Sequence, residues 1–178
     1  MEYGTPVKIP DGRYYLKMTK PVYIQLSKLQ WEMPPARDVI LSLSEAQQEL
    51  VRKYESEILN KAKESSKEWF GREISAATIE KAFESCLEDS SFILQLATYK
   101  GQVATTYFGA DKKQVEAVNG TADVVVELVG VHFFKKSFGP IFKVIQVKET
   151  TQAPKKFPTT YLFEDEPQEE EDPNDYLA

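Results

Sequence analysis

Residues 131–148 contain four lysines and four phenylalanines but no acidic residue. Lysines attract the phosphates of a nucleic acid, and flat rings stack on unpaired bases, each stack contributing roughly 1–3 kcal/mol. Together these two residue types predict a surface that holds a single-stranded nucleic acid. The lysines of the stretch are Lys135, Lys136, Lys143 and Lys148, and the candidate rings are His132, Phe134, Phe138 and Phe142.

Tyrosines elsewhere in the chain could extend this surface. The candidates are Tyr14, Tyr15 and Tyr23 near the N-terminus and Tyr99 and Tyr107 in the middle. The competing interpretation is that such rings fill the core, which we favour for Phe133 and Trp69 because their neighbours are apolar. For Phe134 and Phe138, which lie beside lysines and a turn signal, core packing and base stacking both stay open.

The C-terminal residues 164–178 hold eight acidic residues and no basic one. A run of like charge with few apolar residues cannot bury a core, so we predict a disordered tail over 161–178. A polyanion beside a positive groove can compete with nucleic acid for it and can dock partner proteins, although a tail that serves only solubility is the alternative. The residues expected to contact partners are Glu169, Glu170, Glu171, Asp172, Asp175, Tyr176 and Leu177.

Residue patterns for catalysis are sparse. The chain has no Gly-rich phosphate loop, no paired metal-binding histidines and no nucleophile motif. Asp123 with Gln146 and Lys148 could hold a divalent metal in a nuclease, but these residue types combine often by chance. One cysteine and one histidine leave no zinc site of the usual kind. We therefore expect a protein that is not an enzyme and that carries no metal or cofactor.

The composition fits one globular domain with a core, since 42% of the 178 residues are hydrophobic. The net charge of −6 is unevenly distributed. Residues 1–30 and 92–163 carry positive excesses of three and four charges, whereas residues 31–91 carry a negative excess of five. Local fields decide what a surface attracts, so a negative total does not exclude a nucleic-acid partner. The chain has no apolar run long enough for a membrane span, no signal-peptide pattern and a single Cys86, so we expect an intracellular protein.

Hydrophobic spacing places the candidate residues mainly on strands. Alternating residues predict one or two strands over 13–30, with Pro21 at a strand start or an edge. The stretch 131–148 predicts a hairpin that turns at Gly139-Pro140. Further strands are expected over residues 39–43, 91–97, 103–108, 115–118 and 122–130.

Two helices are predicted between these strands. Ser44 with Gln47 forms a capping-box pattern for a helix over 45–68, which Gly71 ends. Ser75 caps a second helix, whose apolar stripe extends from Ile79 to Leu87. The chain order is therefore strands, helices, strands, and the fold class is mainly β with inserted helices.

Three stretches resemble a known family. Residues 130–148, with Lys-Lys-Ser-Phe-Gly and then Lys-Val-Ile-Gln-Val, are similar to the C-terminal signature of phage-type single-stranded-DNA-binding proteins, which also occur in nucleocytoplasmic large DNA viruses. The segment Ser66 to Gly71, which contains Trp69-Phe70, and the acidic tail resemble the same group. The resemblance extends over about residues 44–178. It departs from the family at His132, where a large aromatic residue is expected, and at the terminal Tyr-Leu-Ala.

The resemblance implies an OB-fold-like five-stranded barrel over residues 1–160, with a helical insertion at about 44–88 and the tail after it. It further implies roles in DNA replication, recombination and repair, with a polymerase or helicase as the tail's partner. The expected location is the host cytoplasm or nucleus for a virus and the bacterial cytoplasm for a phage. RNA as the ligand and a homodimer stay open, as do a metal-dependent nuclease and a protein-interaction or virion module as alternatives.

Overall fold

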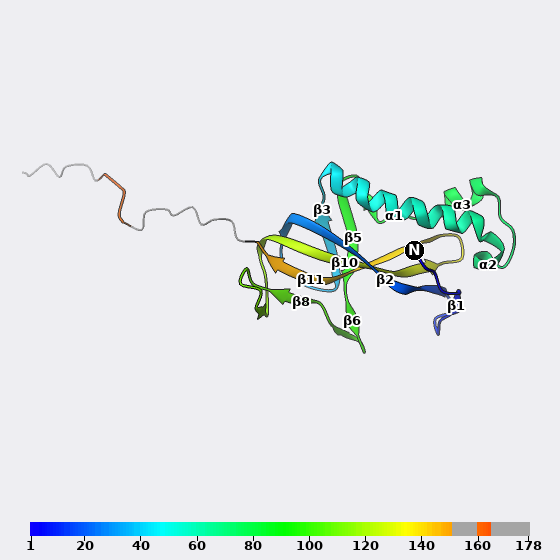
Figure 1. Ribbon diagram of the computed structural model, residues 1–178, viewed down its shortest axis with the longest axis horizontal. Helices are drawn as coiled ribbons and strands as arrows, with labels where there is room; N and C mark the ends of the chain where they lie inside the picture. The colour runs from blue at the N-terminus through cyan, green and yellow to red at the C-terminus, as the bar shows by residue number, and fades with distance from the viewer. Residues whose placement is uncertain (151–159, 165–178) are drawn as a thin grey trace, which may run out of the picture.

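The computed structural model describes residues 1–150 and 160–164, which form a curled β-sheet flanked by helices (Figure 1). The helices are α1 (Glu45–Glu64), α2 (Ser66–Phe70) and α3 (Ala76–Ala82). The strands are β1 (Val7–Lys8), β2 (Tyr14–Trp31), β3 (Asp38–Ser42), β4 (Leu87–Glu88), β5 (Ser91–Leu96), β6 (Thr98–Tyr99), β7 (Gln102–Val103), β8 (Thr106–Phe108), β9 (Gln114–Val115), β10 (Gly120–Phe133) and β11 (Phe138–Glu149). No helix among the described residues is long and apolar enough to cross a membrane.

The strand order identifies the architecture. Five strands lie side by side in the order β2-β10-β11-β5-β3, and β3 returns to contact β2. Neighbours in this order are antiparallel except β11 and β5, which are parallel. This is the strand order of the OB-fold, a partly open five-stranded Greek-key barrel. The prediction of a mainly β, OB-like fold with inserted helices is therefore confirmed.

The first long strand is continuous through Pro21. In its ladder with β10, Val22 pairs with Leu128 and Lys17 pairs with Gly130, so four residues of β2 bulge out between the two pairs. Pro21 lies in this bulge, where its missing N–H interrupts no ladder hydrogen bond. The stretch predicted as one or two strands is thus one strand, and the proline lies at an irregularity within it.

The helical insertion begins where the capping pattern predicted. Ser44 Oγ accepts the Gln47 N–H at 3.3 Å, and Gln47 Oε1 accepts the Ser44 N–H at 3.0 Å. The predicted helix over 45–68 is divided at Ser65 into α1 and α2, and Gly71 ends α2 with a φ of 73°. The insertion therefore contains three helices instead of two.

The last helix, α3, is shorter than the apolar stripe predicted. It begins after Ser75, as expected, but ends at Ala82. Beyond it, the Glu84 N–H donates to the Phe138 carbonyl at 2.8 Å, and the Cys86 N–H donates to Glu55 Oε1 at 2.7 Å. These bonds hold residues 83–86 extended against β11 and α1, so tertiary partners replace the helical hydrogen bonds.

The hairpin of β10 and β11 turns earlier than predicted. The Phe134 N–H donates to the Ser137 carbonyl at 2.7 Å and closes the turn, while Gly139 and Pro140 lie inside β11 opposite His132 and Val131. The prediction of a turn at Gly139-Pro140 is therefore wrong. Gly139 is needed for another reason, because a Cβ there would lie 2.5 Å from the Glu84 carbonyl oxygen.

An aromatic cluster attaches the helices to this end of the barrel. Trp69 packs edge-to-face on Phe133 at 5.8 Å between ring centroids, and Phe70 packs in the same way on Phe138 at 5.2 Å. Phe133 and Phe138 stack with planes 12° apart. The side chains of Phe133 and Trp69 are buried, which confirms their predicted place in the core. Such ring pairs contribute roughly 0.5–1.5 kcal/mol beyond their buried area.

The remaining strands are shorter than predicted. The strand expected over 103–108 is divided into β7 and β8, and the one over 115–118 is reduced to β9. Thr105 lies between β7 and β8, and its hydroxyl donates to the Val144 carbonyl at 2.6 Å. This hydrogen bond holds the chain against β11 where β8 begins. Of the tail predicted over 161–178, residues 161–164 are described, and they are exposed and form no helix or strand. The rest of the tail, with its contact residues 169–177, lies outside the described residues.

The buried cluster yields a prediction about stability. Phe138 is 1% exposed, so Phe138→Ala should lower the free energy of unfolding by about 3–5 kcal/mol, the usual cost of removing a buried phenylalanine. Phe134→Ala, at a half-buried ring in the adjacent turn, should cost much less. Urea unfolding of both variants measures the difference. Equal losses in the two variants would contradict this account of the cluster.

Candidate nucleic-acid interface

A groove of about 660 Å³ crosses the outer face of the barrel. We call it the sheet groove, and the lining residues that matter below are Arg13, Tyr15, Gln95, His132, Phe134, Ile141 and Lys143. It extends over β3 and β5, the second and third strands of the barrel, to residues 134–137, which connect its fourth and fifth strands. In OB-folds, the face of strands two and three and the loop between strands four and five bind oligonucleotides and oligosaccharides.

A group of rings forms one end of the sheet groove. Phe134 contacts His132 with ring centroids 4.5 Å apart, and the Arg13 guanidinium carbon lies 5.1 Å from the Phe134 ring centroid. Asp11 Oδ2 accepts the Arg13 Nε–H at 2.6 Å, and this hydrogen bond lowers the pKa of Asp11. Arg13 is therefore held over Phe134 by a cation–π contact on one side and a carboxylate on the other.

Tyr15 forms part of the groove floor because Gly130 leaves space for it. The Tyr15 hydroxyl donates to the Val129 carbonyl at 3.1 Å. A Cβ on Gly130 would lie 2.9 Å from the Tyr15 ring and 2.1 Å from the Leu16 carbonyl oxygen. Only glycine therefore permits β2 and β10 to approach so closely with the ring lying across them.

Charges of both signs lie along the sheet groove. Arg13 and Lys143 supply positive charge, and Asp38 and Glu84 supply negative charge. Lys143 lies opposite Glu127 in the ladder of β10 and β11. Arg13 lies beside the rings and the turn, so an anionic chain would be attracted to that end of the groove, and Lys143 adds a second cation farther along β11.

His132 contributes a neutral ring at neutral pH. Burial of the imidazole lowers its pKa below 6.5, the nearby Arg13 lowers it further, and Glu84 acts in the opposite direction. A neutral imidazole can stack or accept a hydrogen bond, but it adds no charge for a phosphate. The family that residues 130–148 resemble is expected to have a large aromatic residue at this position.

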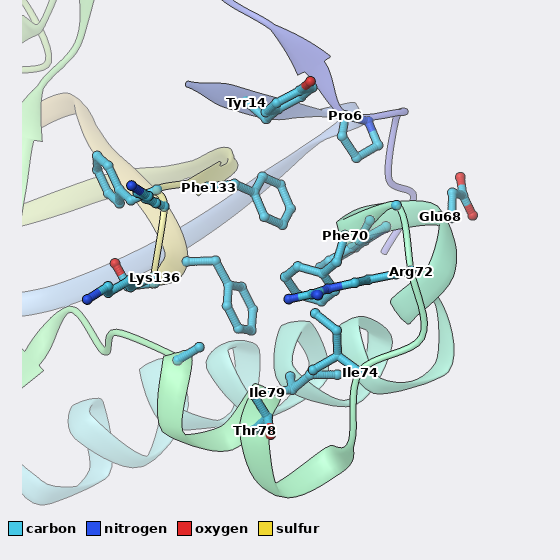
Figure 2. A pocket seen from close by; sticks show the side chains of 17 residues that line it. Pro6, Tyr14, Glu68, Phe70, Arg72, Ile74, Thr78, Ile79, Phe133 and Lys136 are labelled. Carbon is cyan, nitrogen blue, oxygen red and sulfur yellow. The ribbon is translucent and has the colours of Figure 1, made fainter. Parts of the chain in front are cut away.

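A second cavity lies beside the groove. It measures about 510 Å³ between the 134–137 turn and the helices α2 and α3, and we call it the hairpin–helix cavity. Figure 2 shows Phe133 at its centre, Phe70 and Arg72 on the helical side, and Lys136 on the turn. Tyr14 and Phe134 line both this cavity and the sheet groove, so the two hollows are neighbours that share these side chains.

The structure brings most of the predicted residues to these two hollows. His132, Phe134, Tyr15 and Lys143 line the sheet groove, and Lys135 and Lys136 line the hairpin–helix cavity. Tyr14, whose side chain is 48% exposed, lies between them. No ligand is present, so their role in binding stays a prediction.

Three rings predicted for stacking are in the core instead. Phe138, Phe142 and Tyr107 are 1%, 2% and 7% exposed, so the prediction that they stack on bases is wrong. Phe142 packs edge-to-face on Phe92, and Tyr107 packs against Trp31 with centroids 6.2 Å apart. All three rings belong to the core, although Phe138 also lines the hairpin–helix cavity and Phe142 the sheet groove with the small parts that stay exposed.

Lys148 lies away from both hollows. Its ammonium group is 3.8 Å from Asp123 Oδ2, and Asp123 Oδ1 accepts the Lys28 N–H at 3.0 Å. The two residues proposed for a nuclease are thus adjacent, with Gln146 lining the same small pocket. Within residues 1–150 and 160–164, no group of three His, Cys, Asp or Glu side chains is placed to hold a metal ion.

Sequence reasoning missed several lining residues. Arg13 directly precedes Tyr14 and Tyr15, which were predicted to bind, so its position beside them was a signal that could have found it. Arg72, Gln95 and Ile141 lie in segments far apart in the chain, and only the strand order brings Gln95 opposite Lys143. For these three residues the sequence contains no signal.

The strand order and the groove define a mainly β protein of OB-like fold, with a helical insertion and a ring-lined outer groove. The chain belongs to a family of unknown function, DUF5871, whose model matches residues 27–165. No curated protein matches the chain.

Two solved structures are similar in overall shape. One is the single-stranded DNA-binding protein from bacteriophage Enc34 in complex with ssDNA, which is 8% identical, with a TM-score of 0.42 and coverage of 82% of this chain and 93% of that one. The other is a C-terminal truncation of the same phage protein, 11% identical, with a TM-score of 0.40 and coverage of 84% and 95%.

One wall of the sheet groove depends on a buried carboxylate. Glu55 of α1 is 6% exposed and accepts hydrogen bonds from the Cys86 N–H and, at 2.8 Å, from the Ser85 hydroxyl. Burial raises the pKa of Glu55 above its ordinary 4.5, and the two hydrogen bonds oppose that shift. The carboxylate thereby holds residues 84–86 beside the groove.

This arrangement predicts a pH-dependent stability. Because the folded state binds the Glu55 proton more tightly than the unfolded state, the contribution of Glu55 to stability is fully present below about pH 4.5 and is lost as pH rises through the raised pKa. Urea unfolding of the wild type and of Glu55→Gln is measured at several pH values. The unfolding free energy of the wild type minus that of Glu55→Gln should decrease as pH rises from about 4.5 through the raised pKa of Glu55. The same change at exposed Glu49 of α1 is the control, and a flat Glu55 difference would contradict the prediction.

Proposed function

We propose that this protein binds single-stranded DNA in the sheet groove and is not an enzyme. The observation that carries the proposal is the grouping of Phe134, His132 and Tyr15 with the cations Arg13 and Lys143 on the outer face of an OB-like barrel. Rings and cations on one face are the two elements that hold an unpaired strand.

The arrangement assigns separate tasks to the two residue types. Unpaired bases stack on the accessible rings, while Arg13, Lys143 and the exposed turn lysines Lys135 and Lys136 contact phosphates. A duplex keeps its bases paired and inside the helix, so it can use only the phosphate contacts. Binding should therefore favour single strands.

The biological role that we propose rests on the resemblance of residues 130–148 and of the tail to phage-type proteins. The protein would protect single strands during viral or phage DNA replication, recombination and repair. The acidic tail would compete with DNA and dock a polymerase or helicase, with Tyr176 and Leu177 as its apolar anchor. Sequence alone supports the proposal for the tail, since these residues lie outside the described part of the chain.

Fluorescence anisotropy with labelled oligo-dT, across a salt series, tests the groove. Wild-type affinity should fall steadily as salt rises and should exceed the affinity for duplex of equal length. Phe134→Ala should weaken binding by about 1–3 kcal/mol with little change of salt slope, because a stack releases no counterion. Arg13→Ala with Lys143→Ala should reduce the slope by about 1.4, because each lost contact with a single strand changes it by about 0.7.

Matched variants separate these effects from damage to the fold. Phe134→Tyr keeps a flat ring and should retain affinity, and Lys53→Ala removes an exposed charge from α1, outside the groove. Each variant should keep the melting temperature of the wild type to within a few degrees. Equal affinity for duplex and single strand, or an unchanged affinity in Phe134→Ala, would refute binding in this groove.

Removal of residues 165–178 tests the tail separately. The truncated protein should bind oligo-dT more tightly than the full chain, most strongly at about 0.01 M salt, where charges interact over roughly 30 Å. The comparison is a titration of both proteins at low and high salt. Affinities that agree at low salt would exclude competition between the tail and DNA.

A further inference from the structure

The hairpin–helix cavity offers a second contact for the strand bound in the sheet groove. We infer that it holds one unpaired base of that strand, with an adjacent phosphate on Arg72; this inference rests on the proposed function. The helices that form its wall are inserted between β3 and β5, so the cavity lies outside the barrel itself.

The apolar surface of the cavity suits a flat ring. Phe70, which is half-buried, lines the cavity together with Phe133, Ile74 and Ile79 (Figure 2). The volume of about 510 Å³ falls within the roughly 300–1,000 Å³ that is typical of small-ligand pockets. A nucleobase would bury its faces against apolar and aromatic surface there, as bases do on the platforms of proteins that bind single strands.

The charge around the cavity suits a phosphate beside that base. Arg72, Lys135 and Lys136 contribute three cations, and Glu68 is the acidic residue of the lining. In Figure 2 the Arg72 guanidinium is directed from the helical side into the cavity. Among the described residues, the Arg72 guanidinium makes no ion pair within 4.0 Å, so its donors are available to a phosphate.

The cavity also lies on the path of the strand. Tyr14 and Phe134 belong to the linings of both hollows, so a strand that leaves the ring end of the sheet groove passes these side chains and reaches the cavity. The two side chains shared with the groove favour a nucleotide of the same strand over an unrelated ligand. A strand too short to extend past Phe134 would leave the cavity empty.

The test is a length series of oligo-dT, from about 4 to about 16 nucleotides, the range of site sizes known for OB-folds. Ala82→Trp fills the cavity from the end of α3, and Arg72→Ala removes the cation. Ala82→Trp should weaken binding of the longest oligonucleotide about 5- to 150-fold, the loss expected for one base stack. Arg72→Ala should weaken it as well and lower its salt slope by about 0.7, the change expected for one phosphate contact. Both variants should bind the shortest oligonucleotide as the wild type does. The matched control is Ala77→Trp, at an exposed position of α3 that does not line the cavity.

A fluorescent base gives a readout that does not depend on affinity. With 2-aminopurine placed at each position of the oligonucleotide in turn, saturating wild-type protein should change the emission at one end position through contact with the cavity. Ala82→Trp should abolish that change, and Ala77→Trp should preserve it. Both proteins are compared at saturation, so a difference reports the environment of the base.

The outcomes separate the inference from the function on which it rests. If wild-type protein binds no oligonucleotide of any length, the proposed function is wrong. If it binds, but Ala82→Trp and Arg72→Ala bind the longest oligonucleotide as tightly as Ala77→Trp does, the groove stands and the cavity inference is wrong. The inference is also overturned if these variants retain DNA affinity and instead lose binding of a synthetic acidic peptide with the sequence of residues 164–178.

Discussion

The close approach of β2 and β10 at Gly130 is the constraint on which the groove depends. The Leu16 carbonyl oxygen would lie 2.1 Å from any Cβ at this position, so the two strands can cross here only because the residue is glycine. The ladder also shifts its register here, and β10 then continues with Val131 turned to the core and His132 turned to the groove. Tyr15 covers the glycine, and the placement of both groove rings thus follows from one local irregularity.

A second close contact connects the barrel to its helices. Gly139 permits the Glu84 backbone to lie against β11, and Glu55 holds the following residues from the side of α1. The extended segment 83–86 is therefore shared by the helical insertion and the barrel. Any change in the packing of α1 would be transmitted to the groove wall through this segment, which makes the insertion a support for the site as well as a cover for the core.

Burial divides the phenylalanines of the hairpin into two sets with different tasks. Phe138 packs on Phe70 of α2 and Phe142 packs on Phe92 of β5, both in the core. Phe134 instead lies in the turn, with the Arg13 guanidinium over its ring. The lysines of the turn, Lys135 and Lys136, are exposed. The 18 residues 131–148 thus contribute both to the proposed binding surface and to the core that supports it.

Local signals in the sequence were sufficient for the elements that local interactions decide. Ser44 and Gln47 predicted the start of α1, and Gly71 predicted the end of α2, because capping involves residues a few positions apart. Alternation predicted the long strands and the mainly β class, and the family resemblance implied the OB-like barrel. The turn was misplaced because Gly-Pro is a strong local turn signal, and the contact between Gly139 and Glu84 spans 55 positions of the chain.

The sequence by itself determined that aromatic and basic residues would concentrate in one hairpin and that its lysines would be exposed. It did not determine which rings face outward, since one residue of shift in a strand exchanges its two faces. The tertiary structure decided that question through the bulges of β10 and the packing of Phe138 on Phe70. It also decided that Arg13, Gln95 and Lys143 share one groove, because only the strand order of the barrel brings β2, β5 and β11 to the same face.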